Sequence, residues 1–281
     1  MSLLTINKLT ASVGAEVSGL DTSRLAADDA LGAAVLEALE DNGVLVFPGL
    51  HLEPEAQVRF CRRLGGIDHS SDGHHPVAGI YPITLDRSKN SSAGYLRATF
   101  DWHIDGCTPI GDECPQKATV LSAVQVAERG GETEFANSYG AFESLSVEEK
   151  ERLSALRVVH SLEASQRRVN PDRTPEEVAR WRARPTHEHP LVWTHRSGRK
   201  SLVLGASADY VVGMDLDQGR ALLADLLDQA TGADKVYRHT WSVGDTVTWD
   251  NRGVLHRAAP YDPASAREML RTTVLGDEPI Q

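Results

Sequence analysis

The chain has 281 residues, of which 41% are hydrophobic, and its formal net charge is −11 at pH 7. This is enough apolar material for a sizeable core, and the acidic balance argues against a nucleic-acid partner because phosphate binding relies on surplus Lys and Arg. No apolar run reaches membrane-spanning length and the first residues have no signal-peptide pattern, so we expect no membrane partner and a cytoplasmic location.

Hydrophobic periodicity predicts the secondary structure in chain order. Strands are expected near 4–8 and 13–18, a helix at 28–41, a strand at 43–48, a helix at 54–64, strands at 80–85 and 117–126, and a helix at 146–157 with a capping box formed by Ser146 and Glu149. Strands at 190–194 and 201–205, a helix at 217–230, and strands at 236–241, 245–249, 254–259 and 268–275 follow. Many strands with a few flanking helices indicate a mostly-β fold, a jelly roll whose two sheets form a cleft. No repeat or linker interrupts the chain, so residues 1–281 are expected to form one domain.

Two polar segments lack regular patterning. Residues 86–99 are rich in Ser, Asn and Gly, which favours a solvated loop; the functional alternative is a substrate lid in which Tyr95 or Arg97 touches the ligand. Residues 160–188 carry six arginines and three prolines, and a surface insertion is the default expectation there.

The three cysteines form no disulfide framework and no C-x-x-C pair, which fits a reducing compartment. Cys61 lies in a helical pattern and is expected in the core, whereas Cys107 is a candidate for lining a pocket because it follows Asp105 closely.

The pair His103 and Asp105 is the first half of a candidate metal site. Residues two apart in an extended segment point to the same side, so an imidazole and a carboxylate can meet one ion. His256, which ends the run Trp-Asp-Asn-Arg-Gly-Val-Leu-His at 249–256, supplies a third ligand from a distant strand. Two histidines and one carboxylate on one face of an octahedron leave three positions open, which suits non-heme Fe(II) and oxygen activation.

Two arginines follow the last histidine on a predicted strand. Strand periodicity places Arg267, Met269 and Arg271 on one face. Guanidinium groups that point into a fold interior are costly unless anions meet them, and Arg is suited to bidentate recognition of carboxylates and sulfonates. The alternative is a pair of exposed arginines near the C-terminus.

The order of several short motifs carries a family resemblance that spans nearly the whole chain. They lie at 15–21, 43–49, 102–105, 130–133, 189–192, 198–200, 249–252 and 256–258, and they close with the Arg267/Arg271 strand. In this order the chain resembles the taurine dioxygenase family of Fe(II)/2-oxoglutarate-dependent oxygenases, which also holds the alkylsulfatases and phenoxyalkanoate dioxygenases. The resemblance implies a double-stranded β-helix core, cupin-like in kind, and a homo-oligomer, either dimer or tetramer.

Residue by residue, the resemblance implies three groups of site residues. Fe(II) is bound by His103, Asp105 and His256, and the distal carboxylate of 2-oxoglutarate by Thr133 and Arg267. The substrate anion is held by Arg271 and His75, although His74 leaves the register open by one residue, while the Gly106 N–H faces the substrate. Ala78 and Thr99 stand where the taurine enzymes carry a tyrosine and an asparagine, which argues against taurine itself and for a bulkier or more apolar substrate.

The implied reaction consumes O₂ and 2-oxoglutarate, releases succinate and CO₂, and hydroxylates a small-molecule substrate. A sulfonate, an alkyl sulfate or an aryloxyalkanoate is the expected class, with an amino-acid-like or other natural-product substrate as the alternative. Halogenation is disfavoured because the halogenating relatives lack the carboxylate that Asp105 supplies. A Zn-dependent hydrolase could use the same three ligands, but it would leave Arg267 and Thr133 without a task; a non-catalytic jelly-roll protein would not need the triad.

The remaining candidates are expected to be structural. His160, His195 and His239 have no partner spacing, and the His187-Glu188-His189 run follows a proline-bounded loop. Asp250 is expected to orient the turn before His256. Trp102 and Trp249 are expected to keep the site dry by packing, and Trp102 is also a candidate for reaching the cofactor.

Overall fold

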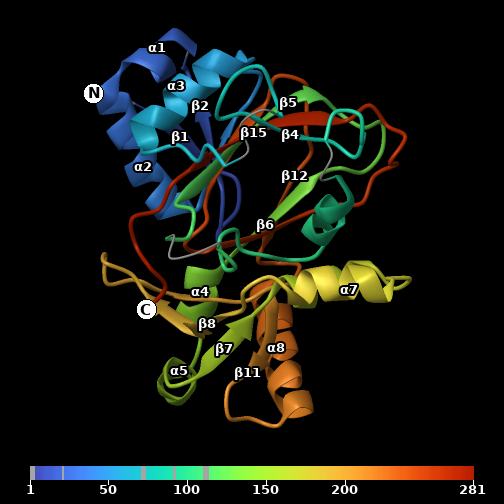
Figure 1. Ribbon diagram of the computed structural model, residues 1–281. Helices are drawn as coiled ribbons and strands as arrows, with labels where there is room; N and C mark the ends of the chain where they lie inside the picture. Colours follow the sequence, from blue (N-terminus) through green and yellow to red (C-terminus); the bar gives the residue numbers. More distant parts are fainter. Residues whose placement is uncertain (1–3, 21, 71–73, 91–92, 110–113) are drawn as a thin grey trace.

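The largest sheet has seven strands and supplies one wall of the site. The computed structural model describes residues 4–20, 22–70, 74–90, 93–109 and 114–281 (Figure 1). Within them the sheet runs in the order β1 (Thr5–Lys8), β2 (Ala15–Ser18), β3 (Val44–Phe47), β13 (Thr246–Asp250), β5 (Ala118–Gln125), β15 (Glu268–Val274) and β4 (Tyr81–Ile83). All neighbours pair antiparallel except β2 and β3, which are parallel.

A three-stranded sheet packs against the inner face of this large sheet. It is formed by β12 (Val236–His239), β6 (Thr133–Asn137) and β14 (Val254–Ala258), with β6 in the middle. Phe135 and Val254 from this sheet share one buried cluster with Val247, Trp249 and Met269 from the large sheet. Two sheets packed face to face in this way form the jelly-roll core that the sequence predicts.

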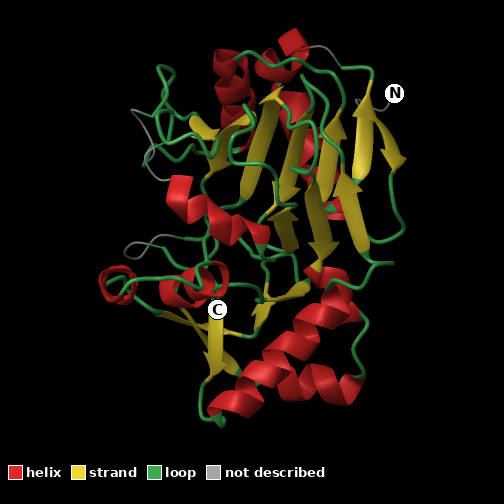
Figure 2. Ribbon diagram, turned by 90° about the vertical axis from the view of Figure 1, so that its right-hand side faces the viewer, coloured by secondary structure: helices red, strands yellow, loops and turns green. Residues whose placement is uncertain are grey.

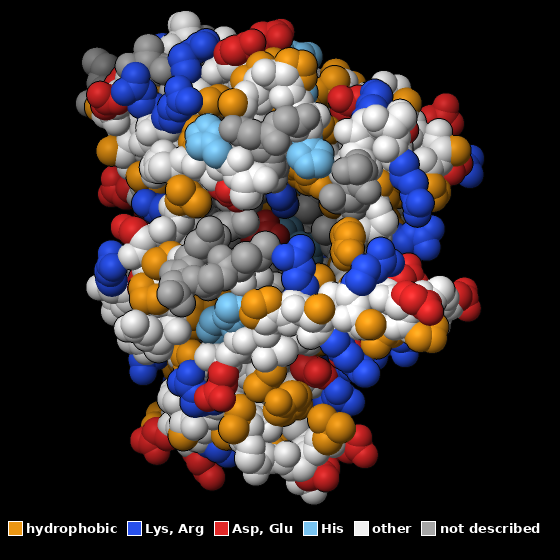
Figure 3. Space-filling view, in the orientation of Figure 1, with side chains coloured by type: hydrophobic (Ala, Val, Ile, Leu, Met, Phe, Trp, Pro, Cys, Tyr) orange, Lys and Arg blue, Asp and Glu red, His pale blue; other side chains and the backbone are white. Residues whose placement is uncertain are grey.

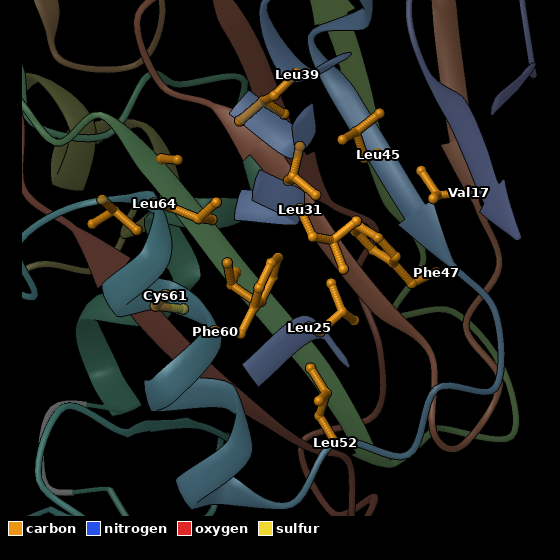
Figure 4. Packing of buried hydrophobic residues seen from close by; sticks show 14 of the residues in the cluster. Val17, Leu25, Leu31, Leu39, Leu45, Phe47, Leu52, Phe60, Cys61 and Leu64 are labelled. Atoms are coloured by element: carbon orange, nitrogen blue, oxygen red, sulfur yellow. The ribbon is translucent and has the colours of Figure 1, made fainter. Parts of the chain in front are cut away.

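Three helices cover the outer face of the large sheet: α1 (Thr22–Ala27), α2 (Asp29–Asn42) and α3 (Pro54–Leu64). Figure 4 shows Leu31 of α2 and Phe60 of α3 directed toward Leu45 and Phe47 of β3. The Phe47 and Phe60 rings meet edge to face, with centroids 6.1 Å apart. Leu270 of β15 belongs to the same cluster, so neighbouring residues of β15 alternate between the helix-covered face and the interior.

The remaining elements pack beneath the two sheets (Figures 1 and 2). One three-stranded sheet consists of β11 (Ala208–Val211), β7 (Arg157–His160) and β8 (His187–Pro190), and a hairpin of β9 (Val192–Thr194) and β10 (Lys200–Leu202) lies beside it. The helices of this part are α4 (Ser138–Glu143), α5 (Val147–Ser154), α6 (Leu162–Val169), α7 (Pro175–Arg182) and α8 (Leu216–Ala230). No described helix is long and apolar enough to span a membrane.

A short 3-10 helix, η1 (Ala93–Phe100), leads into the candidate metal site. The loop expectation for 86–99 is therefore wrong for its second half, although residues 91–92 lie outside the described part. Gln166 of α6 donates from Nε2 to the Tyr95 carbonyl of η1 over 3.4 Å. This contact and the packing of α6 on η1 give the segment a fixed support.

Residues 160–188 form regular elements, which the sequence pattern did not predict, although most of residues 171–186 are exposed as expected of a surface insertion. The segment forms α6, α7 and β8, and Ala164, Gln166 and Trp181 are buried. Ser161 caps α6 by accepting from the Ala164 N–H, and α7 begins with a capping box between Thr174 and Glu177. These caps satisfy the free amides at the helix starts, so the prolines and arginines do not prevent helix formation.

The four predicted helices are present, and the Ser146 capping box of α5 is confirmed. The strand predicted at 190–194 is instead divided at Leu191 between β8 and β9. The predicted strand 201–205 ends at Leu202.

Candidate active site

Two distant segments are joined by a pair of backbone hydrogen bonds that place the two histidines side by side. The His103 N–H donates to the His256 carbonyl over 3.0 Å, and the His256 N–H donates to the His103 carbonyl over 2.9 Å. The imidazole centroids are 4.1 Å apart. Asp105 completes the group: its Oδ1 lies 3.8 Å from His103 Nε2, and its Oδ2 lies 3.7 Å from His256 Nε2.

This group can hold a single metal ion. One ligand atom from each of the three side chains lies within 4.8 Å of the other two, and no other such group of three is found among the described residues. The Asp101 carbonyl lies 2.9 Å from His103 Nδ1. A proton on Nδ1 satisfies that carbonyl and leaves the Nε2 lone pair for the metal.

A buried hydrogen-bond chain supports the carboxylate ligand. Thr119 donates from Oγ1 to Asp105 Oδ2 over 3.3 Å, and Asn251 donates from Nδ2 to Thr119 Oγ1 over 2.9 Å. Thr119 and Asn251 are both fully buried. Such outer contacts fix the orientation of a metal-binding carboxylate.

The electrostatics match the protonation states that metal binding needs. Burial by itself would raise the pKa of Asp105, but its interactions with His256, Arg271 and His103 and the hydrogen bond from Thr119 outweigh burial, and the pKa is lowered. Burial, reinforced by His103, lowers the pKa of His256 to about 3. The carboxylate is therefore ionised and the imidazole neutral at pH 7, so the donor set fits a divalent metal such as Fe(II).

A cavity opens at the three candidate metal ligands. The face of the molecule that Figure 3 shows has a hollow with charged side chains inside it. The cavity combines a polar end with apolar walls. Besides His103, Asp105 and His256, it is lined by Ile83, Leu96, Thr99, Leu121, Thr133, Trp249, Ala258, Tyr261, Arg267 and Arg271.

Arg267 is a buried cation. Its side chain is enclosed, the residue being 3% exposed, and among the described residues no carboxylate lies within ion-pair distance of it. One guanidinium nitrogen donates to the Gly131 carbonyl over 3.1 Å, and its Cζ lies 4.7 Å from the centre of the Tyr261 ring. Burial lowers the pKa of Arg267, and Tyr261 partly offsets this effect. Because an uncompensated buried charge is costly, this site fits an anionic ligand.

Arg271 of β15 lines the same cavity as Arg267, which immediately precedes this strand. Met269, between the two arginines, is buried in the core between the sheets, so the alternation predicted for this strand holds despite a register shift between Glu268 and Met269. The guanidinium Cζ lies 5.1 Å from the centre of the Tyr81 ring. Its Nε is buried and has no hydrogen-bond partner among the described residues.

Three of the residues expected at the substrate lie outside the lining of this cavity. His75 Nδ1 accepts from the Val77 N–H over 3.0 Å. Its neighbour His74 instead packs edge-on against Tyr81, the ring beneath Arg271, with centroids 5.2 Å apart. Gly106 has a positive φ of 86°, and a Cβ there would lie 2.7 Å from the Gln116 nitrogen. Gly106 thus makes a tight turn possible after Asp105.

The third such residue, Tyr95, lies on the other side of η1. Tyr95 and Arg97 line a separate outer cavity between η1 and the α6–α7 region, whereas Leu96 and Thr99 line the cavity at the metal ligands. Two residues were expected to differ from those of the taurine enzymes. Of these, Thr99 lines the cavity at the candidate metal ligands, whereas Ala78 is exposed and does not line it.

The other candidates are structural. His160, His195 and His239 are buried and lie within hydrogen-bond distance of Ser207, Ser201 and Tyr237, respectively. Asp250 is buried and accepts from Arg252 and Tyr139. Cys61 is in the core as expected, and Cys107 and Trp102 are buried outside the cavity lining.

Sequence reasoning missed several residues that shape the site: Ile83, Leu96, Thr119, Leu121, Asn251 and Tyr261. Only Asn251 had a usable signal, because it stands in the 249–256 run that ends in the candidate metal ligand His256. The others are ordinary residues whose role depends on which strands become neighbours.

A jelly roll with two histidines and a carboxylate beside a buried arginine is the arrangement of an Fe(II)- and 2-oxoglutarate-dependent dioxygenase. Over residues 5–273 the chain matches the family described as "Taurine catabolism dioxygenase TauD, TfdA family", and it belongs to this family. It is an oxidoreductase that depends on Fe(II), 2-oxoglutarate and O₂.

Individual relatives agree with this assignment. The chain is 36% identical over 268 residues to the alpha-ketoglutarate-dependent 2,4-dichlorophenoxyacetate dioxygenase of Cupriavidus pinatubonensis, covering 89% of this chain and 91% of that protein. It is 35% identical over 265 residues to the pentalenolactone F synthase of Streptomyces arenae, covering 87% and 86%. The crystal structure of AAD-2 in complex with Mn(II) and N-oxalylglycine superposes with a TM-score of 0.83, at 31% identity and 99% coverage of both chains.

Proposed function

We propose that this enzyme hydroxylates a small organic anion with an apolar body, of the aryloxyalkanoate, sulfonate or alkyl sulfate type, and releases succinate and CO₂. The observation that carries this proposal is the position of Arg271. Its guanidinium is directed into the cavity beside Asp105, it has a buried Nε without a partner among the described residues, and the wall near it is apolar.

The roles of the cavity residues follow from their chemistry. We assign His103, Asp105 and His256 to Fe(II), and Thr133 and Arg267 to the distal carboxylate of 2-oxoglutarate. Bound Fe(II) supplies the oxygen activation that is coupled to decarboxylation of 2-oxoglutarate. Arg267 neutralises the cosubstrate at one end of the cavity, and its own burial keeps water away from that contact.

The substrate anion is assigned to Arg271. A carboxylate or sulfonate held there lies close enough to the metal ligands for an attached carbon to be the one that reacts. Ile83, Leu96 and Leu121 offer an apolar surface for the rest of the molecule. If the hydroxylated carbon bears an ether or ester oxygen, the product collapses to a carbonyl compound and releases the group attached through that oxygen.

A natural-product substrate is the second candidate, since one relative is named pentalenolactone F synthase. A Zn-dependent hydrolase is disfavoured because it has no use for the buried Arg267. His75, Gly106 and Tyr95 have no part in the proposal, since they lie outside the cavity lining. One domain, a homo-oligomer and a cytoplasmic location stay predictions from the sequence.

The decisive experiment measures succinate formed from 2-oxoglutarate with added Fe(II), with and without a panel of candidate substrates. The panel pairs an aryloxyacetate, an alkyl sulfate and an alkanesulfonate with their uncharged amide or ester counterparts. We expect an anionic member to stimulate succinate release well above the level without substrate. Equal stimulation by the charged and uncharged members would contradict the assignment of Arg271.

A further inference from the structure

A buried tryptophan next to the cosubstrate site, Trp241, makes one specific polar contact. Its indole Nε1 donates to Thr133 Oγ1 over 3.0 Å. Trp241 is 7% exposed and Thr133 is 4% exposed, so water does not replace this contact. Thr133 lines the cavity, whereas Trp241 stands behind it and is not part of the lining.

The direction of this hydrogen bond is fixed by chemistry. An indole N–H can only donate, so the Thr133 oxygen must be the acceptor. The hydroxyl has a single hydrogen, which is therefore directed elsewhere. Among the described residues no protein acceptor takes this hydrogen, and the cavity beside Thr133 also contains the buried cation Arg267.

The indole is held in place by its surroundings. The rings of Trp241 and His239 are nearly perpendicular, with centroids 4.6 Å apart and an interplanar angle of 86°. His239 is paired with Thr133 across strands β12 and β6, and its Nδ1 lies 3.0 Å from the Tyr237 hydroxyl. Strand pairing and ring packing thus set where the indole N–H points.

We propose that Trp241 is a positioning residue for 2-oxoglutarate. Its indole N–H donates to the Thr133 oxygen, so the hydroxyl hydrogen of Thr133 is left to donate to the distal carboxylate, next to the charge supplied by Arg267. This inference rests on the proposed function, which assigns Thr133 and Arg267 to that carboxylate. Without the indole N–H, the hydroxyl is free to rotate, and part of its donor capacity toward the carboxylate is lost.

The test compares two Trp→Phe substitutions. Trp241→Phe removes the N–H and keeps an aromatic ring. Trp193→Phe is a matched control because Trp193 is buried and its Nε1 has no hydrogen-bond partner in the part of the chain that the structure describes. Affinity for 2-oxoglutarate is measured calorimetrically on the Mn(II)-loaded protein without oxygen, and KM and kcat are measured on the Fe(II) enzyme. We expect the 2-oxoglutarate Kd and KM to rise about three- to tenfold in Trp241→Phe, the size of one hydrogen bond, with kcat nearly unchanged. Trp193→Phe should leave both constants as in the parent.

A double-substitution cycle shows whether Trp241 acts through Thr133. Thr133→Val should weaken 2-oxoglutarate binding, Thr133→Ser should restore it, and adding Trp241→Phe to Thr133→Val should cause no further loss. The inference would be overturned if Trp241→Phe weakened 2-oxoglutarate binding by the same factor in the parent and in Thr133→Val. An unchanged 2-oxoglutarate Kd in Trp241→Phe would overturn it too. If Trp241→Phe does not fold, Trp241→Leu is measured in its place, because it also lacks the N–H donor. The same rise in the 2-oxoglutarate Kd is expected of it.

Arg267→Ala separates this inference from the proposed function. If Arg267→Ala weakens 2-oxoglutarate binding and Trp241→Phe does not, the positioning role fails while the cosubstrate site stands. If neither substitution weakens it, the cosubstrate assignment itself fails.

Discussion

The guanidinium of Arg267 lies directly against the backbone of Gly131. It donates to the Gly131 carbonyl over 3.1 Å, and a Cβ on Gly131 would stand 2.8 Å from Arg267 Nε. Gly131 also has a φ of +77°, which glycine adopts at little cost. The absence of a side chain at position 131 therefore leaves the space in which the arginine lies.

Gly131→Ala should displace Arg267 and raise the 2-oxoglutarate KM by roughly tenfold or more, since a perturbed charge-assisted contact costs on the order of 2 kcal/mol. The substrate KM should change much less. Gly198→Ala is the matched control: Gly198 has a similar φ of +86° but nothing within 4 Å of its added Cβ. Steady-state kinetics with each ligand varied in turn will check this, and an equal rise in both KM values would speak against the assignment of Arg267.

Asp105→Ala should abolish succinate release that depends on substrate, because the site loses its anionic ligand. Asp277 is an exposed carboxylate far along the chain, so Asp277→Ala should be as active as the parent. Turnover and Mn(II) binding are measured together. Near-normal turnover in Asp105→Ala would remove the metal-triad assignment.

Thr119→Val should weaken metal binding by roughly ten- to a hundredfold, the usual size of a lost contact to a metal-binding carboxylate. The substitution keeps the shape and removes the hydroxyl that donates to Asp105. Thr248→Val is its control, because Thr248 is fully buried and its hydroxyl has no partner among the described residues. Mn(II) titration of each protein gives the comparison; similar Mn(II) affinities for the two variants would show that the hydroxyl of Thr119 does not support the metal site.

Arg271→Gln should raise the KM for an anionic substrate by about tenfold or more, because a hydrogen bond to a charged group contributes about 1.5–3 kcal/mol. The 2-oxoglutarate KM should stay near the parent value. The uncharged amide of the same substrate should show little change, and a matching loss for the charged and uncharged forms would indicate a general distortion of the cavity.

Acid should destabilise the protein partly through His160. Burial, helped by His189 and His187, lowers the pKa of His160 to about 3 from the ordinary value of 6.5. Below pH 6.5 the unfolded chain therefore binds a proton at His160 that the folded protein does not. The contribution of the neutral, buried His160 to the free energy of unfolding is present above pH 6.5 and is lost as the pH falls toward 3. Between pH 7 and pH 5 the loss is about 2 kcal/mol.

His160→Gln removes this titration and keeps a polar group near Ser207. Urea unfolding at pH 7 and pH 5 should therefore show a smaller loss of unfolding free energy in the variant than in the parent. The same pH dependence in both proteins would show that His160 is already accessible to protons in the folded state.

Regular segments of the fold could be predicted from the sequence because their patterns are local. The alternation in 268–275 and the helix-spaced leucines of 217–230 are local signals, and β15 and α8 follow them. By contrast, β6 is five residues long with Glu134 inside it, and it exists because β12 and β14 pair with it on both sides. Such pairing is a tertiary effect that no local pattern carries.

The candidate site divides in the same way. The three candidate metal ligands and the two arginines have recognisable spacings in the sequence, and the structure brings them together around one cavity. His75 lies in an irregular segment whose backbone path depends on contacts such as the Val77 N–H, so its side-chain direction could not be read from spacing. Leu96 and Trp241 are apolar residues like many others until β12, β6 and η1 assemble around the cavity.

The 3-10 helix η1 divides its residues between two environments, with Leu96 and Thr99 toward the metal ligands and Tyr95 and Arg97 toward an outer cavity. The proposed ligands of the metal and of 2-oxoglutarate all lie outside η1. A substitution at Leu96 or Thr99 therefore changes the substrate wall without removing any proposed ligand of the metal or of 2-oxoglutarate. Enzyme engineering aimed at new substrates should begin with libraries at positions 96 and 99.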